Sequence, residues 1–177
     1  TLKSIADAMN KQVGYVAKDR DTESLTLEAS IKDNIAIAGL DKFGVKNFLI
    51  LASKEKTYVN KQVEALSIKC AGANQYVSAL SGGNKQKVAF GKWLGRESEI
   101  LILDCPTRGV DIGVKQAMYQ LMYKMRQEGK SILLISEEMA ELIGMSDRIL
   151  VMKDGELKKE LYRSRDLSEA DVIQYMI

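Results

Sequence analysis

Three short runs of apolar residues constrain the fold most strongly. They occupy residues 100–103, which lead into Asp104, residues 131–135 and residues 148–152. Runs of this length are typical of parallel strands that are buried on both faces of a sheet. The segment 114–128, between the first two runs, has apolar residues at helical spacing. A strand, a crossover helix and a further strand predict an α/β protein with a mostly parallel sheet, whose ligands lie at the carboxyl ends of the strands.

The remaining elements follow from local signals. Residues 12–17 predict a short strand, and a charged loop follows at 18–28. A helix begins near Ser30, whose hydroxyl can cap the free amides while Asp33 completes a capping box. A longer helix is predicted over residues 45–66, with a solvated lysine face and a row of apolar residues, Phe48, Ala52, Val59, Val63 and Leu66.

The helix at 114–128 carries an apolar row that predicts core packing rather than cofactor binding: Met118, Leu121, Met122 and Met125. Gly129 is expected to end this helix.

Composition removes some chemistry but says little about partners. With 177 residues, 46% of them hydrophobic and 28% charged, the chain fits one soluble domain. Its net charge of +2 gives no electrostatic argument for a nucleic-acid or membrane-surface partner. It has no histidine, which removes the commonest general base and metal ligand. Cys70 and Cys105 suggest neither a disulfide framework nor a metal pair, so a reducing compartment is expected. No apolar run is long enough to span a membrane.

The segment 80–84, with the sequence Leu-Ser-Gly-Gly-Asn, is the first candidate functional site. It places Ser81, Gly82 and Gly83 at the start of a predicted helix. Free amides and the positive end of the helix dipole favour a phosphate there. An ordinary helix cap after a flexible loop would explain the same residues.

Neighbouring motifs change that balance. Asp104 is delivered by an apolar strand to the position where phosphate-binding ATPases hold Mg²⁺. Two further motifs follow at residues 105–111 and 134–138. In this order and spacing the segments resemble the signature loop, Walker B strand, D-loop and switch loop of ABC ATPases.

The resemblance narrows to one group within that family. Asn84, the run Pro-Thr-Arg-Gly-Val-Asp at 106–111 and the run Gly-Met-Ser-Asp-Arg-Ile at 144–149 are similar to the second half of fused sugar-import ATPases for ribose, galactose, xylose and related substrates. The resemblance runs from about residue 12 onward. It implies one incomplete nucleotide-binding domain over residues 1–177. Residues 28–95 would form the helical signature subdomain, and residues 12–17 and 96–177 the α/β core.

A Walker A loop, which such a domain needs to hold the β- and γ-phosphates, does not occur in the sequence. The tripeptide Gly129-Lys130-Ser131 mimics its end, but Lys124 stands at the first glycine position and a strand follows. The chain opens on Thr1 rather than Met, so we expect it to be part of a longer protein, with the Walker A strand before Thr1. The chain alone is then not expected to bind ATP tightly or to hydrolyse it.

Three positions depart from the family pattern. Cys105 stands where hydrolytic domains carry the glutamate that polarises water, and a thiol of ordinary acidity is a poor base for that task. Glu137 occupies the switch position, where the family normally carries a histidine. Its carboxylate would repel a γ-phosphate by about 1 to 4 kcal/mol at about 4 Å. Lys18-Asp19-Arg20 occupies the place of the glutamine loop, and its role is left open.

The resemblance implies head-to-tail pairing of two ATPase halves, with ATP and Mg²⁺ as cofactors of the complete transporter. Ser81, Gly82, Gly83 and Asn84 would complete in trans the site of the first half. The chain's own degenerate site would carry Asp104 for Mg²⁺, together with Cys105, Glu137 and, in the D-loop, Asp111.

The expected partners are the first nucleotide-binding half of the same subunit, a transmembrane permease facing residues 18–40 and, indirectly, a periplasmic or lipid-anchored sugar-binding protein. No nucleic acid is expected. This arrangement places the chain at the cytoplasmic side of the membrane, as a peripheral protein. A free sheet edge near the Asp104 strand would also favour self-association of the chain.

Two other classes of function stay open. A soluble ABC protein acting on ribosomes or DNA would also use a signature loop, but basic patches and coiled-coil insertions are not seen in this sequence. A catalytically silent, structural half is the second alternative. The intact Ser81, Gly82 and Gly83 argue against it, since an unused phosphate site has no evident reason to keep two glycines.

Overall fold

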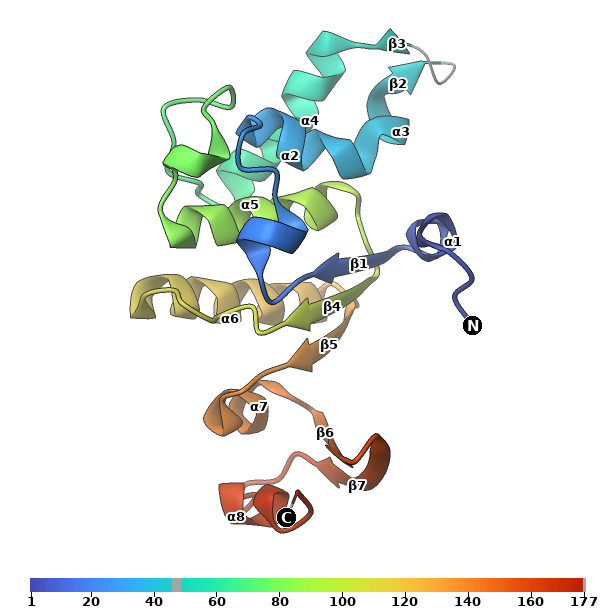
Figure 1. Ribbon diagram of the computed structural model, residues 1–177, viewed down its shortest axis with the longest axis vertical. Helices are drawn as coiled ribbons and strands as arrows, with labels where there is room; N and C mark the ends of the chain where they lie inside the picture. Colours follow the sequence, from blue (N-terminus) through green and yellow to red (C-terminus); the bar gives the residue numbers. More distant parts are fainter. Residues whose placement is uncertain (46–48, 177) are drawn as a thin grey trace. The chain divides into compact units, whose positions relative to one another are not determined.

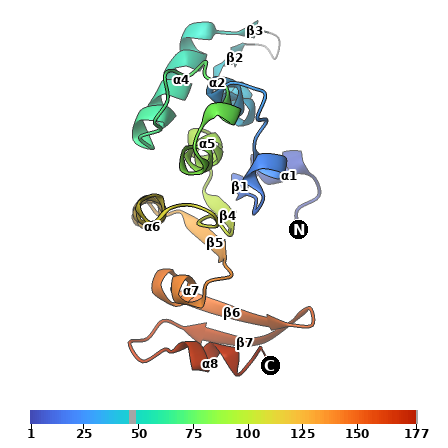
Figure 2. The ribbon, with the colours of Figure 1, turned by 60° about the vertical axis from the view of Figure 1, so that its left-hand side comes forward.

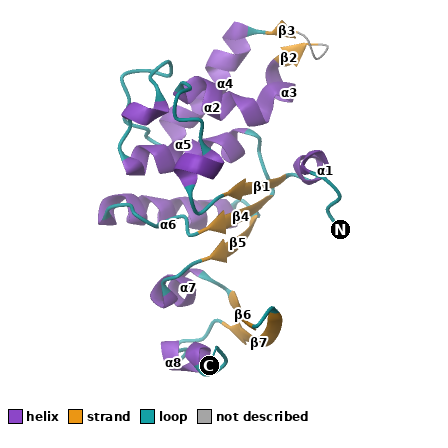
Figure 3. Ribbon diagram, viewed as in Figure 1, coloured by secondary structure: helices purple, strands orange, loops and turns teal. Residues whose placement is uncertain are grey.

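A computed structural model describes residues 1–45 and 49–176 of the chain. Figure 3 distinguishes its helices from its strands. By contacts, these residues form two compact units, Thr1–Leu133 and Leu134–Ile177. None of the described helices combines the length and the apolar character needed to cross a bilayer.

The elements up to the signature segment are α1 (Ile5–Asn10), β1 (Val13–Val16), the π-helix η1 (Arg20–Ser24), α2 (Ile31–Ala36), the 3-10 helix η2 (Ile37–Gly39), α3 (Leu40–Phe43), β2 (Gly44–Val45), β3 (Leu49–Ile50), α4 (Ala52–Ala65) and the 3-10 helix η3 (Val77–Ala79). The later elements are α5 (Gly82–Gly95), β4 (Ile100–Asp104), α6 (Ile112–Gln127), β5 (Ser131–Ile135), α7 (Met139–Met145), β6 (Arg148–Lys153), β7 (Glu156–Tyr162) and α8 (Glu169–Ile173).

The central sheet has the strand order β1-β4-β5. β1 and β4 pair in parallel, from Val13 opposite Ile100 to Val16 opposite Leu103. The arrows of the three strands point the same way in Figure 1. Figure 2 shows α5 and α6 on one side of β1 and β4. The α/β class with a parallel sheet and flanking helices is therefore confirmed.

The two faces of this sheet differ in burial. Val16, Leu101 and Leu103 are fully buried, whereas Tyr15 and Ile100 are 44% and 41% exposed. Side chains alternate between the faces of a strand, so one face forms the core and the other is open. The sequence predicted burial on both faces, and for this chain that prediction is wrong.

A helical layer precedes β4. In it α2, α4 and α5 pack against one another, and their buried side chains include Ile31, Ile35, Val59, Val88 and Phe90. The rings of Phe43 and Tyr58 extend the contact, with centroids 5.2 Å apart.

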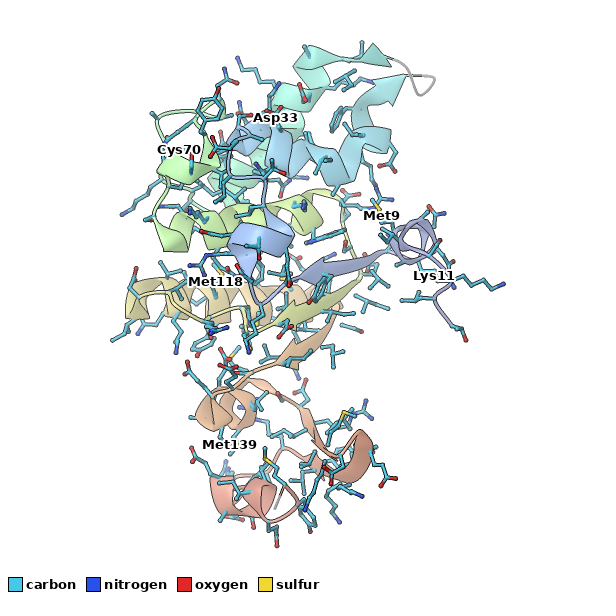
Figure 4. The ribbon with its side chains drawn as sticks, viewed as in Figure 1. Met9, Lys11, Asp33, Cys70, Met118 and Met139 are labelled. Atoms are coloured by element: carbon cyan, nitrogen blue, oxygen red, sulfur yellow. The ribbon has the colours of Figure 1, made fainter. Side chains whose placement is uncertain are left out.

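The second unit is built on an antiparallel hairpin. β6 pairs with β7 from Arg148 opposite Tyr162 to Lys153 opposite Glu156. Its small core contains Ile149, Val151 and Val172, and Met139 (Figure 4) packs against it. The run at 148–152 is thus a strand, as predicted, but its partner β7 is antiparallel.

Most of the predicted elements are present. β1, β4, β5 and β6 lie where the sequence placed strands, and α2 follows the Ser30–Asp33 capping box. Met118 (Figure 4), Met122 and Met125 of α6 are buried. α6 ends at Gln127, and Gly129 adopts a left-handed φ of 85°.

One further prediction is corrected. The helix predicted from residue 45 begins at Ala52, because residues 44–45 and 49–50 pair as β2 and β3; residues 46–48, with Phe48, lie outside the described residues. In the actual helix Val59 and Leu66 are buried, while Ala52 is exposed. The strand that carries Asp104, β4, lies between β1 and β5, so the edges of the described sheet are the two strands beside it.

Candidate functional site

The start of α5 has the geometry that the sequence predicted. Ser81 is its N-cap residue in an extended conformation, but the Ser81 side chain makes no capping hydrogen bond. The Ser81 Oγ instead accepts a hydrogen bond from Asn84 Nδ2 at 2.9 Å. Because the hydroxyl does not cap the first-turn amides, they and the positive end of a 14-residue helix can receive an anion.

Both glycines of this segment also have packing roles. A Cβ on Gly83 would lie 2.5 Å from Val114 Cγ2, and a Cβ on Gly82 would lie 2.9 Å from Arg20 Nη2. The first contact is the stricter, since a valine side chain is stiff while the end of an arginine can move. The structure thus supplies a reason, unrelated to phosphate, for keeping Gly83, and for this glycine the expectation that no such reason exists is corrected.

Asp104 lies at the carboxyl end of β4. Its Oδ2 accepts a long hydrogen bond, 3.4 Å, from the Tyr15 hydroxyl of the adjacent strand. Partial desolvation, and then repulsion from the Asp104 carboxylate, raise the pKa of Tyr15 above its usual value. Tyr15 was not identified from the sequence, although its alternation with the buried Val16 marks it as a residue of the open face.

Cys105 follows directly and is buried, with a left-handed φ of 46°. The amide of Arg108 donates to the Cys105 carbonyl at 3.0 Å, which closes a turn after the strand. Neither Cys105 nor Cys70 forms a disulfide within the described residues. The backbone therefore reverses immediately after Asp104.

Asp111 ends this loop and starts α6. Its Oδ1 accepts a hydrogen bond from the Val114 amide at 2.9 Å, as an N-cap residue does. The sequence assigned Asp111 to nucleotide binding, and the structure adds a helix-capping role.

Glu137 lies in the second unit, in the turn between β5 and α7, and is exposed. In the same turn the amide of Glu138 donates to the Ser136 Oγ at 3.0 Å. Repulsion between Glu137 and a γ-phosphate stays a prediction.

The tripeptide at 129–131 is a helix stop, as predicted. Lys130 Nζ donates to the Ser98 carbonyl at 3.0 Å and lies 3.5 Å from the Glu99 carboxylate. Ser131 begins β5. Lys130 is therefore bound to the residues just before β4.

Arg20 is the main site residue whose role could not be predicted from the sequence. Its Nη1 donates to the Arg108 carbonyl at 3.1 Å, and its Nη2 lies against Gly82. The departure of residues 18–20 from the family pattern was the only sequence signal. Arg20 therefore connects the segment after β1 to the loop at 105–111 and to the first turn of α5.

The residues present fit part of a nucleotide site. The α5 amides suit phosphate oxygens, and the single carboxylate of Asp104 suits Mg²⁺, which is held by one or two carboxylates together with phosphate oxygens and water. Phosphate-holding residues of the Walker A type are absent from this sequence. The arrangement can complete a phosphate site rather than form a whole one.

The chain is similar to known proteins. A family model described as "ABC transporter" matches residues 2–108. The protein named Ribose import ATP-binding protein RbsA from Oceanobacillus iheyensis is 40% identical over 169 residues, which is 96% of this chain and 34% of that protein. Its namesake from Bacillus licheniformis is 42% identical over 163 residues, 92% of this chain and 33% of that protein. The chain thus spans about a third of the length of these relatives.

Solved structures share the fold. The ATP-binding cassette MJ0796, in a dimeric post-hydrolysis state with ADP and Pi, superposes with a TM-score of 0.75 at 20% identity, covering 91% of this chain and 68% of that one. A second dimeric structure of MJ0796 gives a TM-score of 0.73. At this identity the likeness concerns the fold alone.

Proposed function

The chain belongs to the ABC transporter family of ATP-binding proteins, and from this we propose that it is the later part of the second nucleotide-binding half of an importer ATPase that energises sugar uptake. The observation that carries the proposal is the 40% identity to a ribose import ATP-binding protein over 96% of the chain. Ribose is accordingly the first substrate to test.

In this proposal the chain contributes to two unequal ATP sites. Ser81, Gly82, Gly83 and Asn84 act in trans on ATP held by the first half of the same subunit, and the uncapped start of α5 supports that role. The chain's own site holds Mg²⁺ through Asp104 and includes Asp111, but Cys105 and Glu137 replace the groups that hydrolysis needs.

The proposed partners follow from the same assignment. The first nucleotide-binding half pairs with this one, residues 18–40 face a transmembrane permease, and a sugar-binding protein acts through that permease. The subunit would then lie at the cytoplasmic side of the membrane. Residues 28–95 would be the helical subdomain, and residues 12–17 and 96–177 the α/β core.

A catalytically silent half is the second candidate, and one observation favours it. The contact of Gly83 with Val114 gives a reason to keep this glycine without any phosphate. The two candidates differ in what Ser81 does, so substitutions there distinguish them.

The test uses the full-length subunit assembled with its permease. Ser81→Arg fills the start of α5, so we expect ATP hydrolysis to fall below about a tenth of the wild-type rate. Cys105→Ala should keep the rate within about twofold, since a thiol is a poor base for activating water. Ser164→Arg, the same change at an exposed position, is the matched control and should behave as wild type.

Wild-type hydrolysis in Ser81→Arg would favour the silent half. Loss of hydrolysis in Cys105→Ala, with Ser81→Arg active, would reverse the assignment of the two sites. Cys105→Glu is expected to add no second active site, because Glu137 would still place negative charge near the γ-phosphate.

A further inference from the structure

The segment after β1 folds into a self-contained turn beside α5. Residues 20–24 form the π-helix η1 (the short turn between β1 and α5 in Figure 1), closed by the Leu25 amide donating to the Arg20 carbonyl at 2.9 Å. The Ser24 Oγ accepts a hydrogen bond from the Ala17 amide at 3.0 Å, and the Asp19 Oδ1 accepts one from the Thr22 amide at 3.3 Å. π-helical turns are rare and occur frequently at functional sites.

Arg20 points from this turn into the space between two loops. Its side chain is only 19% exposed. Nη1 donates to the Arg108 carbonyl at 3.1 Å, and Nη2 occupies the space that the missing Cβ of Gly82 leaves open, 2.9 Å from that position. One planar guanidinium thus contacts the loop at 105–111 and the first turn of α5 together, which a lysine ammonium could not do in the same way.

Two lysines of α5 hold the turn that carries Arg20. Lys85 Nζ lies 2.7 Å from Asp21 Oδ2, with the two side chains 13% and 39% exposed. Two turns along the helix, Lys92 Nζ donates to the Ser24 carbonyl at 2.8 Å. Residues seven apart lie on the same face of a helix, so η1 is attached to α5 at two points and cannot move freely from it.

The Nε of Arg20 gives a further indication that its place is set by the two loops. This atom and Asp21 Oδ1 face each other at 3.7 Å, and both are buried with no hydrogen-bond partner among the described residues. A guanidinium placed only to pair with Asp21 would close this distance. The hydrogen bond from Nη1 to the Arg108 carbonyl, at 3.1 Å, is therefore a closer contact of the guanidinium than its pairing with Asp21.

We propose that Arg20 is a positioning residue that fixes the loop at 105–111 against the signature segment 81–84, with the Asp21–Lys85 pair holding the turn that carries it. The inference rests on the proposed function, in which the segment 81–84 acts on ATP held by the first half. Loss of Arg20 would let the segments shift relative to each other, and misplacement by about 1 Å can lower a catalytic rate by about 10²-fold.

The test compares Arg20→Gln and Arg20→Lys in the full-length subunit assembled with its permease. Arg20→Gln should lower kcat for ATP by about tenfold or more, with KM for ATP within about twofold, because the first half holds the nucleotide. Arg20→Lys keeps the charge and one donor to the Arg108 carbonyl, so it should recover part of kcat. Arg165→Gln, the same change at an exposed arginine, is the matched control.

A second measurement does not depend on activity. Amide hydrogen exchange in segments 82–84 and 108–111 should quicken in Arg20→Gln and stay at the wild-type rate in Arg165→Gln. If Arg20→Gln fails to fold, the charge swap serves instead: Asp21→Lys and Lys85→Asp should each quicken exchange in these segments, and the double variant should restore it.

The outcomes separate this inference from the proposed function. Wild-type kcat in Arg20→Gln, or no recovery in Arg20→Lys, overturns the positioning role even where Ser81→Arg abolishes hydrolysis. An unaffected Ser81→Arg overturns the proposed trans site instead, and the exchange measurement then decides alone whether Arg20 positions the two segments. Unchanged exchange in every variant overturns the inference.

Discussion

Gly83 has two structural roles. It lies in the first turn of α5, and it packs against Val114 at the start of α6. The first role could be predicted from the sequence, because the Ser-Gly-Gly run before an apolar helix is a local signal. The second could not, because the contact joins residues from different elements and depends on how α5 and α6 pack. The same limit applies to Arg20, whose contacts with Gly82 and Arg108 come from segments distant in the sequence.

Gly83→Ala tests this packing. The added Cβ would lie 2.5 Å from Val114 Cγ2, and overpacking of this kind destabilises by about 1 to 3 kcal/mol. Alanine is the better helix former by up to about 1 kcal/mol, so we expect a net loss of about 1 to 2 kcal/mol in the free energy of unfolding. Urea unfolding followed by circular dichroism measures it.

The control is a double-mutant cycle with Val114→Ala, which removes the methyl group that the new Cβ meets. The loss caused by Gly83→Ala should be smaller in that background, since residues in contact are not additive. Strict additivity of the two substitutions would contradict the packing role.

At the scale of elements, the predictions that succeeded rest on local chemistry. The capping box of Ser30 and Asp33 and the stop at Gly129 each lie within a few residues of the helix end that they mark. The start of α4 was missed because Leu51, its N-cap residue, offers no side-chain cap. The apolar spacing therefore extended the predicted helix back through the short β2–β3 pair.

Ser30→Ala tests the capping box of α2. The Ser30 Oγ accepts a hydrogen bond from the Asp33 amide at 3.1 Å and donates to Asp33 Oδ2 at 2.6 Å. α2 buries most of its residues, so the substitution should lower the free energy of unfolding by about 1 kcal/mol. Ser4→Ala removes the corresponding cap from α1, which buries none of its residues, and should leave the main unfolding transition unchanged.

The decrease in the free energy of unfolding caused by Ser30→Ala should depend on pH. The hydrogen bond from Ser30 lowers the pKa of Asp33 in the folded chain. A carboxyl whose pKa is lower in the folded state than in the unfolded state stabilises the fold at pH values above the unfolded-state pKa. This stabilisation is lost as the pH falls through the folded-state pKa. The difference between wild type and Ser30→Ala in urea unfolding should therefore narrow between neutral pH and about pH 3. A difference that widens on acidification would contradict this assignment.

At the scale of the whole molecule, an apolar run indicates that a strand tends to be buried, but it does not show which face of the strand other elements cover. In β1 and β4 one face is the core and the other exposes Tyr15 and Ile100, and Leu133 of β5 is 49% exposed as well. The sequence predicted self-association through a free sheet edge near the Asp104 strand. The described sheet has its edges at β1 and β5, on either side of β4, and its open face offers a second surface for association.

Self-association of the 177-residue chain should therefore depend on this open face. Exposed apolar side chains gathered on one face favour association, since each square ångström removed from water contributes about 25 cal/mol. Ile100→Lys places a charge at the start of β4 and should shift the chain toward monomer in sedimentation velocity runs at high concentration. Ile5→Lys makes the same change on α1, at a side chain that is 80% exposed, and should leave the distribution as in wild type. A monomeric wild-type chain, or equal dissociation by both variants, would show that the open face does not drive association.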